Sequence, residues 1–421
     1  MRYDISVLGL GYIGLPTSAV FATKGRRVLG VDIVPAVVET INSGKIHIEE
    51  PDLDLIVRAA VQSGNLCAAT APQPAETFII AVPTPFSATL GGRKIPDLTF
   101  VEAAARSLAP VIAEDNLVVL ESTSPVGTTE RVRGWLADEL AKRHSAINIE
   151  KIHFAHCPER ILPGQMIREL ISNDRVVGGF TPEAAVRAKA LYASFCAAEI
   201  FITDARTAEM TKLTENAFRD VNIAFANELS LICEKIGINV WELIRLANRH
   251  PRVKILQPGP GVGGHCIAVD PWFIVDAAPE DARVIRVARE VNDSKPKHVI
   301  AKIRQAVSQN AASGVRPVVA LLGLAFKANV DDLRESPAVE IALELANSDP
   351  PLQILAVEPH IHSLPPALVA AKIELSSLDA ALERANSVVL LVDHNAFKSI
   401  PVEKLSGKKL VDTRGIWSDM G

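Results

Sequence analysis

The sequence predicts an α/β protein with two Rossmann-like, doubly wound domains joined by a long central helix. Three patterns support this fold class. The N-terminal half repeats the order strand, polar turn, helix, which is typical of parallel sheets covered by helices on both faces. A helical pattern follows over residues 204–237, and a second series of short apolar strands begins near residue 318. We therefore expect three domains, over residues 1–203, 204–308 and 309–421.

The chain opens with a strand, a glycine turn, a helix and a second strand, in the stretch DISVLGLGYIGLPTSAVFATKGRRVLGVD. Gly9 permits the tight turn, Gly11 lets the backbone approach a pyrophosphate, and Gly14 lets the helix pack on the strand. Asp32 ends the second strand, where a carboxylate binds ribose hydroxyls and repels a 2′-phosphate. The pattern predicts an NAD site rather than an NADP site. The alternative is a glycine turn that serves packing alone.

Three further strands of this half run into polar turns, in the stretches TFIIAVPTP, NLVVLESTSPVGTTERV and KIHFAHCPERILPG. Thr84, Thr123 and Glu159 follow the apolar part of each stretch. Ligands of open α/β sheets bind outside the carboxyl ends of the strands, so these side chains are candidate site residues. The alternative is turn chemistry and helix capping, which also favour polar residues there.

The central helix carries a polar stripe. Lys212, Asn216 and either Arg219 or Asp220 follow one another at three- and four-residue steps, so they share one side of the helix. From the helix alone, a solvated face and a ligand-binding face are equally supported. The apolar steps of residues 204–237 exceed what one chain would bury, which predicts a homodimer or a higher homo-oligomer.

A loop rich in glycine and proline, QPGPGVGGHCIAVDP, surrounds Cys266. These residues weaken helices and strands, and shaped loops often hold functional groups. A lone cysteine is more often a small buried apolar residue, so the loop by itself does not decide the role of Cys266. His250, Arg252 and Lys254 lie just upstream, which favours an anionic ligand nearby, although they also suit a solvated loop.

The C-terminal part repeats the α/β pattern, with strands expected in RPVVALLG, LQILAVEPH, SVVLLVDH and KKLVDTRGIW. Glu358 is placed much as Asp32 is in the first domain. The turn GLAFK lacks the three-glycine spacing, so we expect a ligand other than a second dinucleotide, such as a nucleotide diphosphate. The border with the central part is expected near residues 309–317.

Composition limits the partners. The net charge of −5 is mild and no basic run occurs, which argues against nucleic acid. The five cysteines stand singly, without a CxxC pair or a zinc-like His/Cys cluster, so we expect no metal and a reducing cytoplasm. The sequence contains no run of about 18 uncharged apolar residues, so it predicts no membrane span. The apolar residues 5–22 are interpreted as strand and helix rather than a signal peptide, because glycines interrupt them.

Several motifs occur in an order that resembles the UDP-glucose/GDP-mannose dehydrogenase family over essentially the whole chain: GLGYIGLP, VPTP, ESTSPVGTT, CPER, EMTKLTEN, GVGGHCIAVDP and GLAFKANVDDLRESPA. The resemblance implies that the C6 alcohol of a nucleotide sugar is oxidised to a carboxylate while two NAD are reduced. It implies that Cys266 forms a thiohemiacetal and then a thioester. The GGHC form is similar to the N-acetylhexosamine branch of the family. The stretches TKLTENAFRDVNIAFANELSLIC and WELIRLANRHPRV resemble the members that act on UDP-N-acetyl-D-mannosamine, which implies this sugar as the substrate.

The resemblance also implies roles for individual residues. It implies a catalytic set made of Cys266, Lys212, Asn216, Asp270, Thr123 and Glu159. It implies NAD contacts from Gly9, Gly11, Tyr12, Ile13, Gly14, Asp32, Thr84, Thr123 and, from the last domain, Arg334. It implies UDP-sugar contacts from Arg160, Ile161, Lys212, Asn216, Arg219, His250, Arg252, Gly263, Lys327 and Arg414. Of these, Arg252 is a candidate to reach in from a partner subunit.

Two positions depart from the UDP-glucose enzymes, which have serine at the position of His265 and lysine at that of Val269. Details of the base in that mechanism therefore do not transfer directly. Two rival functions stay open: oxidation of the C2 epimer UDP-N-acetylglucosamine, and a non-catalytic NAD-binding scaffold. The joint presence of Cys266, Lys212 and Asp270 argues against the scaffold.

Overall fold

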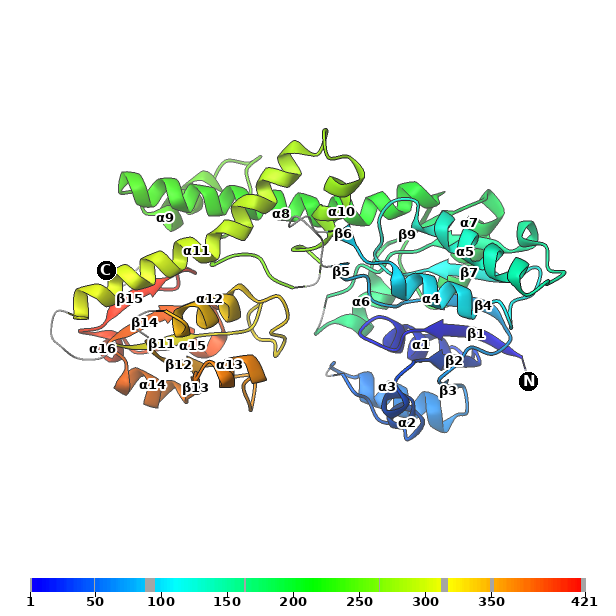
Figure 1. Cartoon of the computed structure of the whole chain (residues 1–421), viewed down its shortest axis with the longest axis horizontal. Helices are drawn as coiled ribbons and strands as arrows, with labels where there is room; N and C mark the ends of the chain where they lie inside the picture. The colour runs from blue at the N-terminus through cyan, green and yellow to red at the C-terminus, as the bar shows by residue number, and fades with distance from the viewer. Residues whose placement is uncertain are drawn as a thin grey trace. The chain divides into compact units, whose positions relative to one another are not determined.

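The computed structural model describes residues 2–48, 50–87, 95–162, 164–264, 266–311, 317–348 and 352–417. His265 and part of the expected domain border near residues 309–317 lie outside the described residues. The chain divides into two compact units, Met1–Glu215 and Asn216–Gly421. Each unit is built around a mainly parallel sheet with helices on both faces, as the sequence predicts (Figure 1). The division into three domains stays a prediction.

The first unit contains an eight-stranded sheet with the order β10-β9-β8-β7-β4-β1-β2-β3. Every neighbouring pair is parallel except β8 and β9, which are antiparallel. The eight strands are β1 (Tyr3–Leu8), β2 (Val28–Val31), β3 (Leu66–Ala69), β4 (Ala75–Ile80), β7 (Leu117–Leu120), β8 (His153–His156), β9 (Arg175–Gly179) and β10 (Ile200–Asp204). A separate antiparallel pair is formed by β5 (Phe86–Ser87) and β6 (Ile95–Pro96).

Two hydrophobic cores lie on opposite faces of this sheet. Val7 and Ile79 belong to one core and their chain neighbours Leu8 and Ile80 to the other, because successive strand residues point to opposite faces. The near-continuous apolar strands are therefore buried on both sides, as expected of parallel sheets. The first core is covered by α1 (Gly14–Thr23), α2 (Pro35–Asn42), α3 (Leu53–Gln62), α6 (Met166–Ser172) and α7 (Pro182–Tyr192). The second is covered by α4 (Thr99–Ser107) and α5 (Thr128–Lys142).

The second unit contains a five-stranded sheet, parallel throughout, with the order β13-β12-β11-β14-β15. Its strands are β11 (Val318–Leu322), β12 (Gln353–Val357), β13 (Glu374–Leu375), β14 (Ser387–Leu390) and β15 (Lys409–Asp412). One face packs on α11 (Arg283–Ala311), α12 (Pro337–Ala346) and α13 (Pro366–Ala370). The other packs on α14 (Leu378–Arg384), α15 (Asn395–Lys398) and α16 (Val402–Leu405).

The central helix α8 (Ala205–Ile236) is unbroken, which confirms the long helix predicted over residues 204–237 (Figure 1). Gly237 follows it with φ +74°, a left-handed conformation that ends helices and suits glycine. The border between the two units falls within α8. Two shorter helices, α9 (Val240–Ala247) and α10 (Asp270–Ala277), flank the cysteine loop in sequence. Among the described residues, no helix combines the length and the apolar character needed to cross a lipid bilayer.

Candidate active site

The turn between β1 and α1 has the shape of a phosphate cradle. Gly9 has φ +92°, and a Cβ on it would lie 2.6 Å from the carbonyl oxygen of Ala81. A Cβ on Gly14 would overlap the carbonyl oxygen of Gly9. A Cβ on Gly11 would meet no described atom within 4 Å, so the space in front of this residue is open. The first and third glycines therefore serve packing, and the middle one leaves room for a ligand.

Asp32 closes this cradle at the end of β2. Its carboxylate accepts hydrogen bonds from the backbone nitrogens of Leu10 at 3.1 Å and Val34 at 3.0 Å. Helix α1 begins after Tyr12 and Ile13, its N-cap residue Ile13 makes no side-chain capping hydrogen bond, and its first turn carries no acidic residue. Its positive dipole end therefore faces the turn without a side-chain anion of its own. These features fit NAD, with the pyrophosphate over the turn and the ribose at Asp32.

His47 belongs to the same corner and was not predicted. Burial lowers the pKa of this imidazole, and the nearby Asp32 carboxylate raises it in part. The sequence offered no signal for it, because residue 47 reaches Asp32 only through the fold of the segment between α2 and α3.

The predicted strand-end residues meet at one edge of the sheet. Thr84 follows β4 and donates a hydrogen bond from Oγ1 to the carbonyl oxygen of Thr123, 2.7 Å away, in the turn after β7. Glu159 follows β8, which is the next strand in the sheet. The carboxyl ends of these three parallel strands therefore bring Thr84, Thr123 and Glu159 to the same edge as the glycine turn.

Glu159 forms an ion pair with a buried arginine. Its Oε2 lies 2.9 Å from a guanidinium nitrogen of Arg175 on β9, and its Oε1 accepts from the backbone nitrogen of Arg160 at 2.7 Å. Burial, and then the charge of Glu159, raise the pKa of nearby Glu121 to about 8, which favours the protonated carboxyl. Sequence reasoning missed Arg175 and Glu121. The only signal was an arginine directly before the apolar residues of β9.

The other residues of the CPER stretch have structural partners. Arg160 pairs with Glu215 on α8 at 2.7 Å, and Ile161 packs against the first core. Glu209, six residues earlier on α8, accepts from the backbone nitrogens of Gly127 at 2.6 Å and Thr129 at 2.7 Å. A carboxylate thus occupies the N-terminus of α5, a favourable place for an anion. These contacts anchor the start of α8, which carries the half-buried Lys212.

In the second unit, the cysteine loop meets α8. Asn216 donates a hydrogen bond from Nδ2 to Oδ2 of Asp270, 2.5 Å away, and both residues are buried. Asp270 is the first residue of α10, and its backbone nitrogen donates to the carbonyl oxygen of Cys266 at 2.8 Å. Of the five cysteines, Cys266 alone is exposed. The structure therefore groups an accessible thiol with two of the predicted catalytic side chains.

The glycines of the loop allow close packing against the C-terminal sheet unit. A Cβ on Gly263 would overlap the carbonyl oxygen of Glu335 and lie 2.7 Å from Pro337 Cδ. Gly264 has φ +84°, and a Cβ on it would lie 3.0 Å from the ring of Phe326. The loop that carries Cys266 thus rests on the GLAFKANVDDLRESPA segment, and glycine is required for that approach.

The remaining predicted residues of this unit are more dispersed. Arg414 donates from Nε to Oδ1 of Asp393 at 2.8 Å, and its guanidinium lies against Gly259 of the loop. Arg334 makes a two-pronged pair with Asp332 at 2.6 and 2.8 Å. A further four predicted residues are exposed: Arg219, His250, Arg252 and Lys327. Asp220, the other candidate for the helix stripe, is fully buried.

The C-terminal sheet has a turn and a carboxylate that correspond to Gly9 and Asp32 of the NAD site, but its carboxylate is occupied by hydrogen bonds within the protein. Gly323 has φ +92°, like Gly9, and Glu358 follows β12 as Asp32 follows β2. The Oε2 atom of Glu358 accepts from the backbone nitrogens of Leu324 at 2.7 Å and Ala325 at 2.9 Å, and it lies 3.1 Å from Nε2 of His394. Because these partners occupy the carboxylate, it does not offer the ribose contact that Asp32 does.

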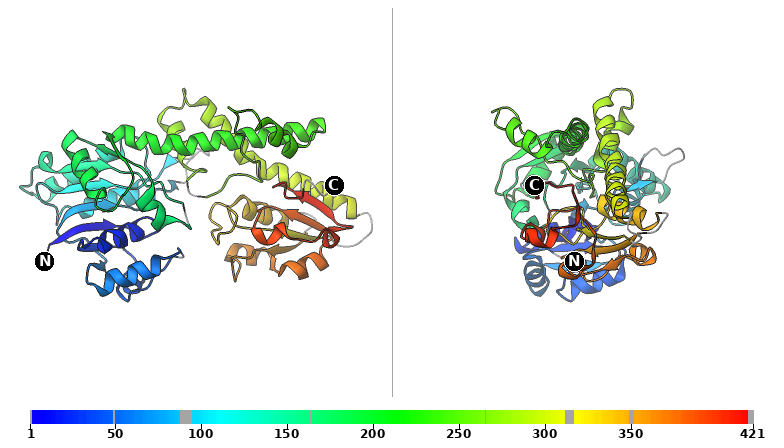
Figure 2. Two further views of the ribbon diagram at one scale, coloured as in Figure 1. Left: turned by 180° about the vertical axis from the view of Figure 1, so that it is seen from behind. Right: turned by 90° about the vertical axis from the view of Figure 1, so that its left-hand side faces the viewer.

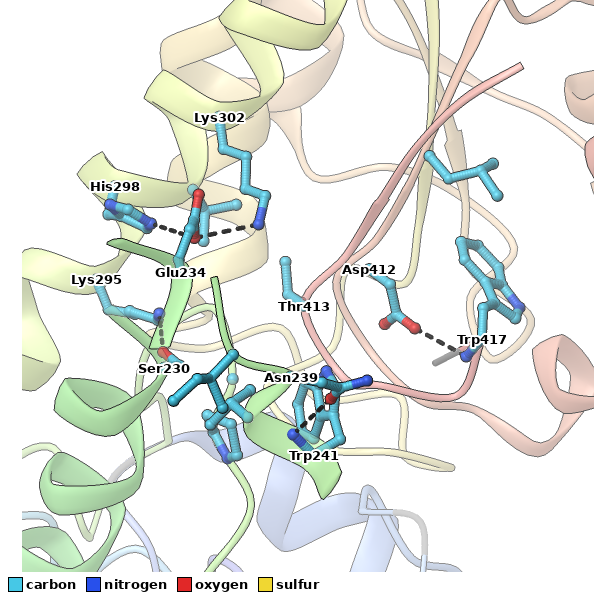
Figure 3. A pocket seen from close by; sticks show the side chains of 16 residues that line it. Ser230, Glu234, Asn239, Trp241, Lys295, His298, Lys302, Asp412, Thr413 and Trp417 are labelled. Carbon is cyan, nitrogen blue, oxygen red and sulfur yellow. Dashed lines mark hydrogen bonds and ion pairs between the residues drawn. The ribbon is translucent and has the colours of Figure 1, made fainter. Parts of the chain in front are cut away.

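A cavity of about 420 Å³ lies beside the loop in the second unit (Figure 3). Lys295 donates to Ser230 Oγ at 2.5 Å, and His298 and Lys302 each lie 3.1 Å from Oε2 of Glu234. Burial lowers the pKa of Lys295 to about 8. Among the described residues of the cysteine loop, Pro258 and Gly259 line this cavity and Cys266 does not.

The glycine cradle, Asp32 and the accessible thiol define an NAD-dependent dehydrogenase, and the comparisons specify its family. Three family models match: the NAD binding domain over residues 3–196, the central domain over 206–294 and the UDP binding domain over 320–419, all of the UDP-glucose/GDP-mannose dehydrogenase family. The chain belongs to this family, whose members oxidise nucleotide sugars with NAD.

Close relatives carry two different substrate names. The chain is 58% identical to an NDP-N-acetyl-D-galactosaminuronic acid dehydrogenase of Ralstonia nicotianae, over 98% of this chain and 96% of that protein. It is 56% identical to a UDP-N-acetyl-D-mannosamine dehydrogenase of Escherichia coli, over 98% and 99%. Among solved structures, that of a UDP-D-ManNAc dehydrogenase from Pyrococcus horikoshii is similar with a TM-score of 0.88 and 39% identity, covering 99% of this chain and 96% of that one.

Proposed function

We propose that this protein oxidises the C6 alcohol of UDP-N-acetyl-D-mannosamine to the carboxylate and reduces two NAD in doing so. The observation that carries the proposal is the exposed Cys266 beside the buried Asn216–Asp270 pair, on a glycine loop packed against the UDP binding domain of the family. A scaffold that only binds NAD has no use for an accessible thiol next to a buried amide and carboxylate.

The reaction proceeds in two oxidations. NAD supplies the acceptor for each hydride. Lys212 accepts the proton of the C6 hydroxyl as that carbon loses its first hydride and becomes an aldehyde. The Cys266 thiolate then adds to the aldehyde carbon, and loss of the second hydride from the thiohemiacetal leaves a thioester. Water adds to the thioester carbon and the C–S bond breaks, which releases the carboxylate product and restores the Cys266 thiol.

The Asn216–Asp270 pair orients an oxyanion donor. Because Asp270 accepts from Nδ2 of Asn216, the side-chain amide is held in one orientation. The same NH2 group carries a second hydrogen, which would donate to the oxygen of the thiohemiacetal. Lys212 lies one turn earlier on α8, and Glu159 is the proposed residue for the hydrolytic water. Preorganised donors of this kind typically contribute about 100- to 1,000-fold to the rate of acyl transfer.

The C2 and C4 configuration of the sugar is the finer part of the proposal. The GGHC loop and the RHPRV stretch favour the mannosamine substrate, while the relative from Ralstonia favours an N-acetyl-D-galactosamine nucleotide as a second candidate. UDP-N-acetylglucosamine is the third.

A panel of UDP-N-acetyl-D-mannosamine, its glucosamine and galactosamine isomers and UDP-glucose decides among them. We expect kcat/KM at least about 10-fold higher for the mannosamine sugar, because a site built for one hydroxyl arrangement leaves polar groups unpaired with the others. NADH release and the mass of the acid product are measured, with two NADH expected per acid. A faster galactosamine or glucosamine substrate would overturn the mannosamine assignment, and no NADH from any sugar would favour the scaffold.

We also propose that the protein works as a homodimer built on α8, in the reducing cytoplasm that its single cysteines favour. Phe218, Phe225 and Ile232 recur at seven-residue steps along this helix, and they are 68%, 53% and 47% exposed. Residues seven apart share one helix face, so these side chains form an uncovered apolar stripe. A second copy related by a two-fold axis would bury it.

The dimer proposal is tested by mass in solution. We expect sedimentation at twice the 45.2 kDa of one chain, and the Phe225→Glu variant is expected to shift toward the single-chain mass. Val186→Glu on α7 is the matched control, because Val186 is 58% exposed but belongs to another helix. Single-chain mass for the unmodified protein contradicts the proposal.

A further inference from the structure

A buried ion pair joins α8 and α11 directly behind the cysteine loop. Arg289 and Asp220 are both fully buried, and one guanidinium nitrogen of Arg289 lies 2.5 Å from Oδ1 of Asp220. The same nitrogen donates to the carbonyl oxygen of Ile267, 3.3 Å away, which is the residue after Cys266. The other terminal nitrogen pairs with Asp293. One side chain thus connects two helices to the C-terminal end of the loop.

The pair extends through two asparagines to the other end of the loop. Asn292 donates from Nδ2 to Oδ1 of Asp220 at 2.8 Å and accepts from Nδ2 of Asn227 at 2.8 Å. Asn227 in turn accepts from the backbone nitrogen of Gly259 at 2.9 Å. Asn227 and Asn292 are almost completely buried. A continuous chain of hydrogen bonds therefore runs from the carbonyl oxygen of Ile267 to the backbone nitrogen of Gly259.

The segment between these two points needs such support. Residues 259–267 contain four glycines. Glycine has the largest backbone conformational freedom, so holding this segment in one conformation costs more entropy than for other residues. Figure 1 and Figure 2 show α11 passing alongside the C-terminal half of α8. The hydrogen bonds of the network join the two helices, since Asp220 and Asn227 belong to α8 and Arg289 and Asn292 to α11. Both helices are long, with 32 residues in α8 and 29 in α11, so they provide a frame for the loop.

A buried ion pair is an expensive way to join two helices. Taking both charges out of water costs several kcal/mol, and apolar side chains of the same size often stabilise a fold as well or better. Burial also raises the pKa of Asp220 to about 6, against the effect of Arg289. The charged groups are therefore better explained by directional hydrogen bonding to the loop than by helix packing.

We propose that Arg289, Asp220, Asn292 and Asn227 form a positioning network that clamps both ends of the loop and so aims the Cys266 thiol at the substrate carbon. These residues are not proposed to touch the substrate. The inference rests on the proposed role of Cys266, but the clamp itself is testable without that role.

The same pair of helices supplies a matched control. Glu234 on α8 binds His298 and Lys302 on α11, two turns beyond the network, and neither partner is a residue of the loop. Glu234→Gln therefore weakens the joint between the helices while leaving the network intact. Any effect that arises from helix packing alone will appear in this variant as well.

The experiment uses two network variants of the full-length protein. Arg289→Lys keeps the charge but loses the planar guanidinium, one nitrogen of which contacts both Asp220 and Ile267 while the other pairs with Asp293. Asn227→Ala removes the acceptor for the backbone nitrogen of Gly259. We expect kcat to fall about 10- to 100-fold with KM for the UDP-sugar within about threefold of the unmodified value, because misplacing a reacting group by about 1 Å costs up to about 100-fold. If Arg289→Lys does not fold, Asn227→Ala carries the test, since it breaks only uncharged hydrogen bonds.

Amide hydrogen exchange gives a readout independent of activity. Peptides covering residues 257–270 are expected to exchange at least about 10-fold faster in both variants and at the unmodified rate in Glu234→Gln. Faster exchange without loss of kcat would show that the clamp exists but that Cys266 does not depend on it, which overturns the positioning role. Unchanged exchange, or an equal loss of kcat in Glu234→Gln, overturns the clamp.

Discussion

The Cys266→Ser variant is expected to lose about 1,000-fold or more of kcat while keeping its fold. Cys266 is exposed, so serine fits without a cavity or a clash. The thiolate is the reactive form of cysteine, and a serine hydroxyl at the same point ionises far less readily. The second oxidation, which requires a covalent adduct on the side chain, then has no efficient route. The measurements are NADH release with the preferred UDP-sugar and the temperature midpoint of unfolding.

A second cysteine variant shows whether the loss of kcat is specific to Cys266 or follows from any cysteine-to-serine substitution. Cys67 is half-buried on β3 of the first unit, where its sulfur lies 3.3 Å from the hydroxyl of Tyr3. We expect Cys67→Ser to keep kcat within about twofold, as is usual for substitutions remote from the reacting groups. Normal acid formation by Cys266→Ser would refute the covalent mechanism and leave the NAD-dependent activity of the family in place.

The second large effect concerns the choice of dinucleotide. We expect kcat/KM for NAD to exceed that for NADP by at least about 100-fold, because a 2′-phosphate would lie against the Asp32 carboxylate. Two like charges about 4 Å apart repel each other by about 1 kcal/mol in water and by several kcal/mol in a partly buried site. Each 1.4 kcal/mol corresponds to a tenfold change in kcat/KM. Two backbone hydrogen bonds hold the carboxylate, so it cannot turn away without losing them.

Asp32→Asn removes this charge with little change of shape. It is expected to lower kcat/KM for NAD about 10-fold, through weaker ribose binding, and to narrow the preference over NADP to less than about 10-fold. Asp4→Asn is the matched control: Asp4 lies on β1 and binds the backbone nitrogen of Arg27 at 2.8 Å, at the opposite end of the same strand pair. Equal kcat/KM for NAD and NADP in the unmodified protein would contradict the placement of the ribose at Asp32.

Local patterns were sufficient to predict much of the fold. The strand at Val28–Val31, the glycine turn and the long helix were all predicted close to their observed bounds, because each depends on residues near one another in sequence. Glycine spacing sets the turn, apolar runs set the strands, and three- and four-residue steps set the helix. Cys266, Asn216 and Asp270 were predicted as catalytic residues from the family resemblance. The structure joins Asn216 to Asp270, and the catalytic roles stay predictions.

Other features depend on contacts between distant residues. The strands β9 and β10 were not predicted. The alternating pattern of strands and helices predicts a parallel sheet, whereas β9 pairs antiparallel with β8, and β10 then pairs with β9. Arg175 lies 16 residues from Glu159 in sequence, and its role appears only when β9 places it behind that carboxylate. Neither signal is periodic, so neither is visible in one segment alone.

The sequence by itself determined the class of fold, the NAD cradle and the place of the glycine-rich loop around Cys266, because glycine spacing, strand ends and short motifs are local properties. Only the tertiary structure decided which side chains support that loop. Asp220 and Arg289 are 69 residues apart, and each by itself reads as an ordinary charge on a helix. Their burial against each other follows from the packing of α8 on α11, and packing depends on the whole set of side chains between the two helices.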